Sequence, residues 1–279
     1  MVQPSSNAPW TRPASALVMA ALAASLMASA AAFLLIEART ARAASGESYR
    51  LARAEREAER ALAIASVKLD AGETLPSHGE ILLLPSGARV LRQDAAGLID
   101  INAASPETLA QLLQGLGESR ERAVALSDAI ADWRDEDNLV RAHGGERDAY
   151  IDAGLAPPAN RPFATEGELS AVVGVTPALL ECALPFLTTY SGQVDIDAAA
   201  APSELRALLS ANTPTQASVG APLGRVIALR AEAPLSEHAS LARTIWVRLT
   251  GDPSRPLFIH RAEQSFAQAN RFDCGAARS

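Results

Sequence analysis

The chain has 279 residues and a formal net charge of −7, and 48% of its residues are hydrophobic although only 4% are aromatic. This length suffices for one large domain or two modest ones, and the composition predicts a helical interior packed mainly by Ala and Leu. The negative charge argues against general binding to nucleic acid, because phosphate contacts require clustered Lys and Arg.

An uncharged apolar run from Ala16 to Ile36 dominates the N-terminal region. About 21 residues at ~1.5 Å per residue span roughly 30 Å, so the run predicts a transmembrane helix after a leader of residues 1–15. A cleaved secretory signal is the alternative, because the run contains Ala-x-Ala-like sequences. Only Arg12 precedes the run, whereas Arg39 and Arg42 follow it. The positive-inside rule therefore favours a cytoplasmic location for the residues after the run, which conflicts with a periplasmic C-terminal region.

Residues 37–70 are expected to continue this helix out of the membrane. Their apolar residues recur at intervals of three and four, which is typical of one buried helix face, and the charged residues lie off that face. Gly72 is a plausible C-terminal stop. The buried face is predicted to consist of Leu51, Ala54, Ala58, Leu62, Ala65 and Leu69.

After this helix, strand-like and helical segments follow in an order that predicts an α+β fold. Two short strands flank the turn Pro85-Ser86-Gly87, a helical region follows, and three more strand-like runs come last. We expect residues 71–104 and 186–279 to form an α+β domain into which a helical domain, residues 105–185, is inserted. The predicted strands are 80–84, 88–92, 224–230, 244–249 and 257–261.

The sequence Gly115-Leu116-Gly117 lies between two predicted helices. A Gly-hydrophobic-Gly turn is the pattern of helix-hairpin-helix modules, whose glycines let backbone N–H groups approach a phosphate. Glu118 and Glu121 offset the neighbouring Arg120 and Arg122, so the charge pattern gives this interpretation little support. We interpret the segment as a packing turn and keep phosphate binding as the alternative.

An acidic cluster runs from Asp128 to Asn138, and Glu146 and Asp148 follow it after two glycines. Like charges four residues apart on one helix face, as at Asp128 and Asp132, repel unless a cation compensates them. A Ca²⁺ ion, which takes six to eight oxygen ligands, is one solution. The alternative is a solvated acidic loop whose counter-charges are supplied by Arg134, Arg141 and Arg147.

Catalytic motifs are missing from the sequence, because its four histidines are scattered and it contains neither a P-loop nor a G-x-S-x-G elbow. We therefore expect no enzyme activity. Two cysteines, Cys182 and Cys274, do not have a metal-ligand spacing. They either pair in an oxidising compartment or remain buried thiols.

Three motifs follow one another in a specific order: Asp132-Trp-Arg-Asp135, Pro158-Ala-Asn-Arg-Pro-Phe163 and Leu187-Thr-Thr-Tyr-Ser191. In combination they resemble the minor pseudopilin K subunits of bacterial type II secretion systems, the general secretion pathway protein K family. The resemblance implies a pseudopilin fold, in which a long N-terminal helix packs on a small antiparallel sheet. It also implies a large inserted all-α domain of the SAM or helix-hairpin-helix type.

By the same resemblance, the chain is a non-enzymatic subunit at the tip of the periplasmic pseudopilus, where it supports protein export across the outer membrane. Its implied partners are the minor pseudopilins I and J, and its implied location is the inner membrane, with a single span and most of the chain in the periplasm. No nucleic acid is expected. The alternative function is that of a membrane-tethered helix-hairpin-helix protein that binds DNA in the periplasm.

The resemblance also implies two sites. A structural calcium ion is expected in the inserted domain, with Asp135, Asp137, Glu146 and Asp148 as its ligands. Processing of the leader is expected between Ala14 and Ser15, although Ala14 stands where the prepilin peptidase normally meets Gly.

Overall fold

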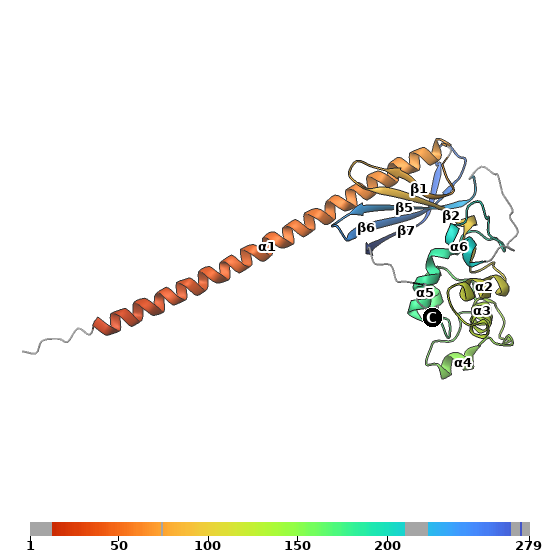
Figure 1. Cartoon of the computed structure of the whole chain (residues 1–279), viewed down its shortest axis with the longest axis horizontal. Coiled ribbons are helices and arrows are strands. Elements are labelled where there is room, and N and C mark those ends of the chain that lie inside the picture. Colours follow the sequence, from red (N-terminus) through yellow and green to blue (C-terminus); the bar gives the residue numbers. More distant parts are fainter. Residues whose placement is uncertain (1–12, 74, 210–222, 269–273, 275–279) are drawn as a thin grey trace, which may run out of the picture. The chain divides into compact units, whose positions relative to one another are not determined.

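The computed structural model describes residues 13–73, 75–209, 223–268 and Cys274 (Figure 1). Contacts within the chain define two compact units, Met1–Arg53 and Ala54–Ser279. Helix α1, Pro13–Asp70, is continuous and contributes residues to both units. The predicted helix over residues 37–70 is therefore confirmed.

In the first unit, the described apolar side chains of α1 as far as Tyr49 are exposed, among them Leu26, Met27 and Phe33. Across the described residues, no helix combines the length and the apolar character needed to cross a bilayer. Residues 1–12 of the predicted leader, and the side chains of residues 13–24, lie outside the described residues. The start of the predicted membrane span and the predicted processing site at Ala14 and Ser15 fall in this part of the chain.

In the second unit, the end of α1 packs against an antiparallel sheet (Figure 1). The predicted apolar face is buried from Ala54 onward, whereas Leu51 is only half-buried. Small side chains such as Ala58 and Ala65 let the helix backbone lie close to the strands, and Glu59 forms an ion pair with Arg243 of the sheet.

The sheet has five strands in the order β1-β2-β5-β6-β7, and every neighbouring pair is antiparallel. All five predicted strands are present, although the sixth strand in chain order, predicted at 244–249, begins five residues earlier. Gly87 has a φ of 83° and forms the turn between the first two strands, as predicted. The strands are β1 (His78–Leu83), β2 (Arg89–Asp94), β5 (Val226–Pro234), β6 (Ala239–Leu249) and β7 (Leu257–Gln268).

Between β2 and β5 the chain forms a helical region that contains a short parallel strand pair, β3 (Ile99–Asp100) and β4 (Leu187–Thr188). Its α-helices are α2 (Pro106–Gly115), α3 (Arg120–Arg134), α4 (Arg147–Asp152), α5 (Pro177–Ala183) and α6 (Ser203–Leu208). Its 3-10 helices are η1 (Ala95–Gly97), η2 (Glu166–Ala171) and η3 (Leu184–Phe186).

Local sequence explains where three of these helices begin. Ser105, Ser119 and Thr176 each accept a hydrogen bond from a backbone N–H in the first turn of α2, α3 and α5. Such caps satisfy N–H groups that have no partner within the helix. Pro106 and Pro177 occupy the first helical position, where the missing N–H has no cost.

One hydrophobic core holds the helical region together and draws on residues from Leu98 to Leu209. Trp133 of α3 stacks on Phe163 with ring centroids 4.1 Å apart, and Tyr150 of α4 is fully buried beside them in the same core. The core thus includes residues on both sides of the range 105–185 that the sequence analysis assigned to the inserted domain. The domain boundaries themselves remain a prediction.

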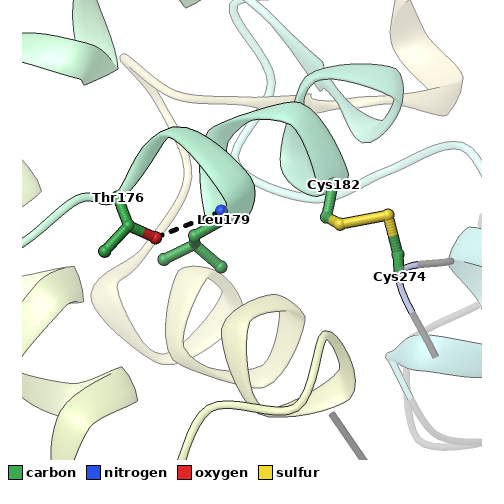
Figure 2. Close-up of a disulfide and its surroundings, with 4 residues drawn as sticks. All are labelled: Thr176, Leu179, Cys182 and Cys274. Carbon is green, nitrogen blue, oxygen red and sulfur yellow. Dashed lines mark hydrogen bonds between the residues drawn. A yellow bond between two sulfur atoms is a disulfide. The ribbon is translucent and has the colours of Figure 1, made fainter. Parts of the chain in front are cut away.

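The two cysteines form a disulfide between Cys182, in α5, and Cys274, which follows β7 (Figure 2). Their Cα atoms are 5.7 Å apart, and 92 positions separate them in sequence. This pairing decides between the two alternatives that the sequence left open. Disulfides of this kind persist mainly in oxidising compartments such as the bacterial periplasm.

Candidate metal centre

The acidic cluster is built on the last turns of α3 and on the loop that follows it. Asp132 is fully buried, and the loop folds back so closely that a Cβ atom on Gly144 would collide with its carboxylate. The backbone N–H of His143 donates to Asp128 at 3.1 Å. The loop is therefore fastened to α3 through two carboxylates of the helix.

Arg141 of this loop neutralises part of the cluster. Its Nη1 lies 2.6 Å from Oδ1 of Asp132 and 2.5 Å from Oδ2 of Asp135. Its backbone N–H donates to Oδ2 of Asp132 at 3.2 Å. The hydrogen bonds that Arg141 donates to Asp135 and Asp132 raise the pKa of Arg141, so the guanidinium stays charged.

Glu146 is the least satisfied group in the cluster. Its side chain is only 6% exposed, yet neither carboxylate oxygen has a hydrogen-bond partner. Burial raises the pKa of Glu146, and so do the negative charges of Asp132, Asp135 and Asp137. Buried polar atoms are normally hydrogen-bonded, so a carboxylate of this kind requires an explanation such as an ion.

Asn160, from the Pro158–Phe163 segment, packs onto the same loop. Its φ of 48° lies in the left-handed region, its N–H donates to the carbonyl of Trp133, and its Nδ2 donates to the carbonyl of Asp137 at 2.9 Å. Its Oδ1 is buried without a partner, as is Oδ1 of Asp135. The sequence analysis singled out Asn160 only as part of a motif, because nothing local connects it to residues more than 20 positions away.

The predicted calcium ligands therefore occupy different settings. Asp135 and Glu146 present buried oxygens without partners, whereas Asp137 is exposed and its Oδ1 accepts the N–H of Leu139. Asp148 is exposed in the first turn of α4. Among the described residues, no three Asp, Glu, His or Cys side chains are arranged so that they hold a metal as they stand.

The chemistry of the donor set nevertheless fits a hard cation. Asp132, Asp135 and Asp137 place negative charge near Glu146, and Arg141 forms ion pairs with the first two of these carboxylates. The oxygens without partners belong to Asp135, Glu146 and Asn160, and carboxylate and amide oxygens are the ligands that Ca²⁺ prefers.

The Gly115-Leu116-Gly117 turn does not offer free N–H groups to a phosphate. The N–H groups of Leu116, Gly117 and Glu118 all donate to carbonyls of α2. A Cβ atom on Gly115 would lie 2.9 Å from the Cβ of Leu208 in α6, so close packing of α6 explains this glycine. Both observations support the packing turn and weigh against the DNA-binding alternative.

Comparison with known proteins finds sequence similarity that includes most of the helical region. A family model described as type II secretion system (T2SS), protein K, matches residues 88–192, which extend from β2 to the loop after β4. The type II secretion system protein K of Dickeya chrysanthemi is 36% identical over 77 residues, 28% of this chain and 21% of that protein. That of Pectobacterium carotovorum subsp. carotovorum is 38% identical over 79 residues, 27% of this chain and 24% of that protein.

The chain also shares its fold with a solved structure. A chain of the crystal structure of the GspK-GspI-GspJ complex from the enterotoxigenic Escherichia coli type 2 secretion system superposes with a TM-score of 0.50. The superposition covers 82% of this chain and 99% of that chain at 18% sequence identity. The sequence matches, by contrast, span only about a quarter of the length of the curated relatives.

A long helix on an antiparallel sheet, with a helical region between β2 and β5, defines an α+β fold that the chain shares with the solved GspK-GspI-GspJ structure. The family match falls on the inserted region, and the curated relatives carry the same name. Within residues 88–192 the chain is thus similar to the type II secretion system protein K family, and its fold is that of a chain in the GspK-GspI-GspJ complex.

Proposed function

We propose that this protein is a minor pseudopilin of the K type, a non-enzymatic subunit of a type II secretion system. The observation that carries the proposal is the position of the family match, residues 88–192, within a pseudopilin-like fold. The structural relative comes from a complex named for three subunits, GspK, GspI and GspJ. The partners are accordingly the minor pseudopilins I and J, with this subunit at the tip of the periplasmic pseudopilus.

The proposal includes a single membrane span over residues 16–36, with the bulk of the chain in the periplasm. Leu26, Met27, Phe33, Leu34 and Leu35 are each more than 60% exposed, and such side chains need an apolar environment such as lipid. The disulfide supports a location of the C-terminal part of the chain on the oxidising side of the membrane. Cleavage between Ala14 and Ser15 belongs to the same proposal, and N-terminal sequencing of the membrane-bound protein tests it.

The inserted region, in this proposal, is a helical domain of the SAM or helix-hairpin-helix type that carries a structural calcium ion. Asp135, Asp137, Glu146 and Asp148 are the proposed ligands. The buried oxygens of Asp135 and Glu146 have no hydrogen-bond partner, which supports these two residues as ligands. Oδ1 of Asn160 is also buried without a partner, so we add Asn160 to the proposed ligands. Calcium supplies charge neutralisation and a fixed coordination shell that holds the loop after α3.

Co-purification tests the assembly. The full chain, extracted in detergent with tagged subunit I and untagged subunit J of the same system, is expected to give a ternary complex in calcium. A tagged unrelated periplasmic protein is the control. Failure to recover the chain with I and J, in calcium as well as in chelator, would contradict the proposed function.

A single variant tests the proposed calcium site separately from the assembly. Glu146→Gln keeps the shape of the side chain and removes its charge, so it is expected to weaken calcium binding in a direct titration. A matched control is Glu136→Gln, because Glu136 is exposed in the same loop. Equal calcium affinity of the wild type and the Glu146 variant would exclude Glu146 from the ligand set.

A further inference from the structure

We propose that Arg141 is an internal counter-ion that competes with a divalent cation for the acidic cluster at the end of α3. The inference rests on the calcium site proposed above and adds a residue that is not one of its ligands. In this view the cluster always holds a positive charge, which is the guanidinium when the metal is absent.

The geometry makes Arg141 the natural competitor. A single nitrogen, Nη1, lies within 2.6 Å of carboxylate oxygens from both Asp132 and Asp135. Asp132 is satisfied on both oxygens, because the N–H of Arg141 reaches the second one. Asp135 is satisfied on one oxygen only, and its Oδ1 is buried without a partner. Asp132 is therefore the fixed anchor of Arg141, and Asp135 is the carboxylate open to a second cation.

Arg141 alone does not balance the charge of the cluster. It pairs with Asp132 and Asp135, whereas Glu146 also feels the negative charge of Asp137, and neither oxygen of Glu146 has a donor among the described residues. The guanidinium of Arg134, at the end of α3, is directed to the carbonyl oxygens of Ile101 and Ala104. When the guanidinium of Arg141 is the only cation at the cluster, negative charge remains in excess and the carboxylate of Glu146 has no hydrogen-bond donor.

A divalent cation corrects this deficit but conflicts with the present position of Arg141. A Ca²⁺ ion bound to Asp135 lies about 2.3–2.6 Å from the carboxylate oxygen, so it stands close to the guanidinium on the same group. Two cations at such a distance repel strongly in a partly buried site. Binding of the metal therefore requires Arg141 to withdraw from Asp135 while its contact with Asp132 remains available.

This competition has two consequences. The loop after α3 stays closed without metal, because Arg141 holds it to Asp132 and the N–H of His143 holds it to Asp128. The affinity for calcium is lowered, because part of the binding free energy is used to move Arg141. Removing the guanidinium should therefore tighten calcium binding and weaken the metal-free fold.

The test is a calorimetric calcium titration of the full chain in detergent, comparing Arg141→Gln with Arg147→Gln. Arg147 is exposed one residue beyond Glu146, so its variant makes the same change in net charge without touching Asp132 or Asp135. We expect Arg141→Gln to bind calcium about tenfold more tightly than the wild type, and Arg147→Gln to change the affinity less than about twofold.

Thermal unfolding of the same proteins gives the second readout. In chelator Arg141→Gln should melt below both the wild type and Arg147→Gln, and saturating calcium should remove the difference. If Arg141→Gln is unfolded in chelator, recovery of the fold on adding calcium supports the proposal and continued unfolding overturns it. Arg141→Lys, which keeps the charge but loses the two-carboxylate contact, should lie between the wild type and Arg141→Gln.

Weaker or unchanged calcium binding by Arg141→Gln, relative to Arg147→Gln, would overturn the proposal. Absence of calcium binding in every variant would overturn both the calcium site and the competition. Neither result bears on recovery of the wild-type chain with subunits I and J, which tests the assembly separately.

Discussion

Single residues set the shape of the acidic loop. Gly144 lies against the carboxylate of Asp132 and the backbone of Asp128, where any side chain would force the loop away from α3. Asn160 reaches the same loop from a distant segment and adopts a left-handed conformation that Asn tolerates better than most residues. Steric fit at these positions decides whether the carboxylates of α3 and Glu146 come together.

The first prediction concerns Gly144→Ala. We expect a loss of roughly 1–3 kcal/mol in the free energy of unfolding, because the added methyl group has no space beside Asp132. Chemical denaturation of the full chain in chelator measures it. Gly167→Ala is the control, because its added Cβ meets only Oγ1 of Thr165 at 3.8 Å and should leave stability within about 0.5 kcal/mol. Equal stability of the two variants would contradict the packing argument.

At the scale of elements, the central strand pair β2 and β5 is joined by a half-buried ion-pair network. Glu232 of β5 accepts hydrogen bonds from Arg89 of β2 at 2.8 Å and from Arg230 of its own strand at 2.9 Å. Burial acts to raise the pKa of Glu232, but these hydrogen bonds and charges outweigh it, so its pKa is lowered. The network therefore stabilises the folded state when Glu232 is ionised.

The second prediction follows from the sign of this shift. The stabilisation is fully present above the unfolded pKa of about 4.5 and is lost as the pH falls through the lower folded pKa. Glu232→Gln should cost roughly 1–3 kcal/mol near pH 7, and the gap to the wild type should shrink below about pH 4.5. Glu237→Gln, in the turn after β5, is the control. A gap that stays constant from pH 7 to pH 3 would contradict the assigned role of the carboxylate.

At the scale of the whole molecule, contacts distant in sequence connect the helical region to the sheet. The disulfide links α5 to Cys274, which follows the sheet's last strand (Figure 2), and Arg261 of β7 forms an ion pair with Glu166 of η2 at 2.9 Å. Asp197, which follows β4, pairs with Arg225 just before β5. These links fix the inserted region to β7, to the start of β5 and to Cys274, all of which follow it in the chain.

The third prediction concerns the disulfide. It closes a loop of 92 positions, for which loss of chain entropy in the unfolded state predicts a stabilisation of roughly 4–5 kcal/mol. The double variant Cys182→Ser, Cys274→Ser should therefore melt well below the wild type under oxidising conditions. Reductant should lower the melting temperature of the wild type to that of the variant and leave the variant unchanged. If reductant has no effect on the wild type, the disulfide does not stabilise the fold.

The sequence alone determined the elements whose signals are local. The spacing of Ala54, Ala58 and Leu62 predicted the buried face of α1, because a helix repeats every 3.6 residues and packs on one side. Strand-like runs and the turn at Gly87 predicted the five strands, and the ordered motifs predicted the family whose model matches residues 88–192. These features depend on residues within a few positions of one another.

Only the tertiary structure decided what depends on the closure of long loops. The pairing of Cys182 with Cys274, and the placement of Asn160 beside the acidic loop, join segments that no local pattern connects. The sequence also did not predict the bonds of Arg141 to Asp132 and Asp135, because a charge pattern does not show which carboxylates an arginine in a loop will contact. Such contacts form only when the helical core has closed and brought these side chains together.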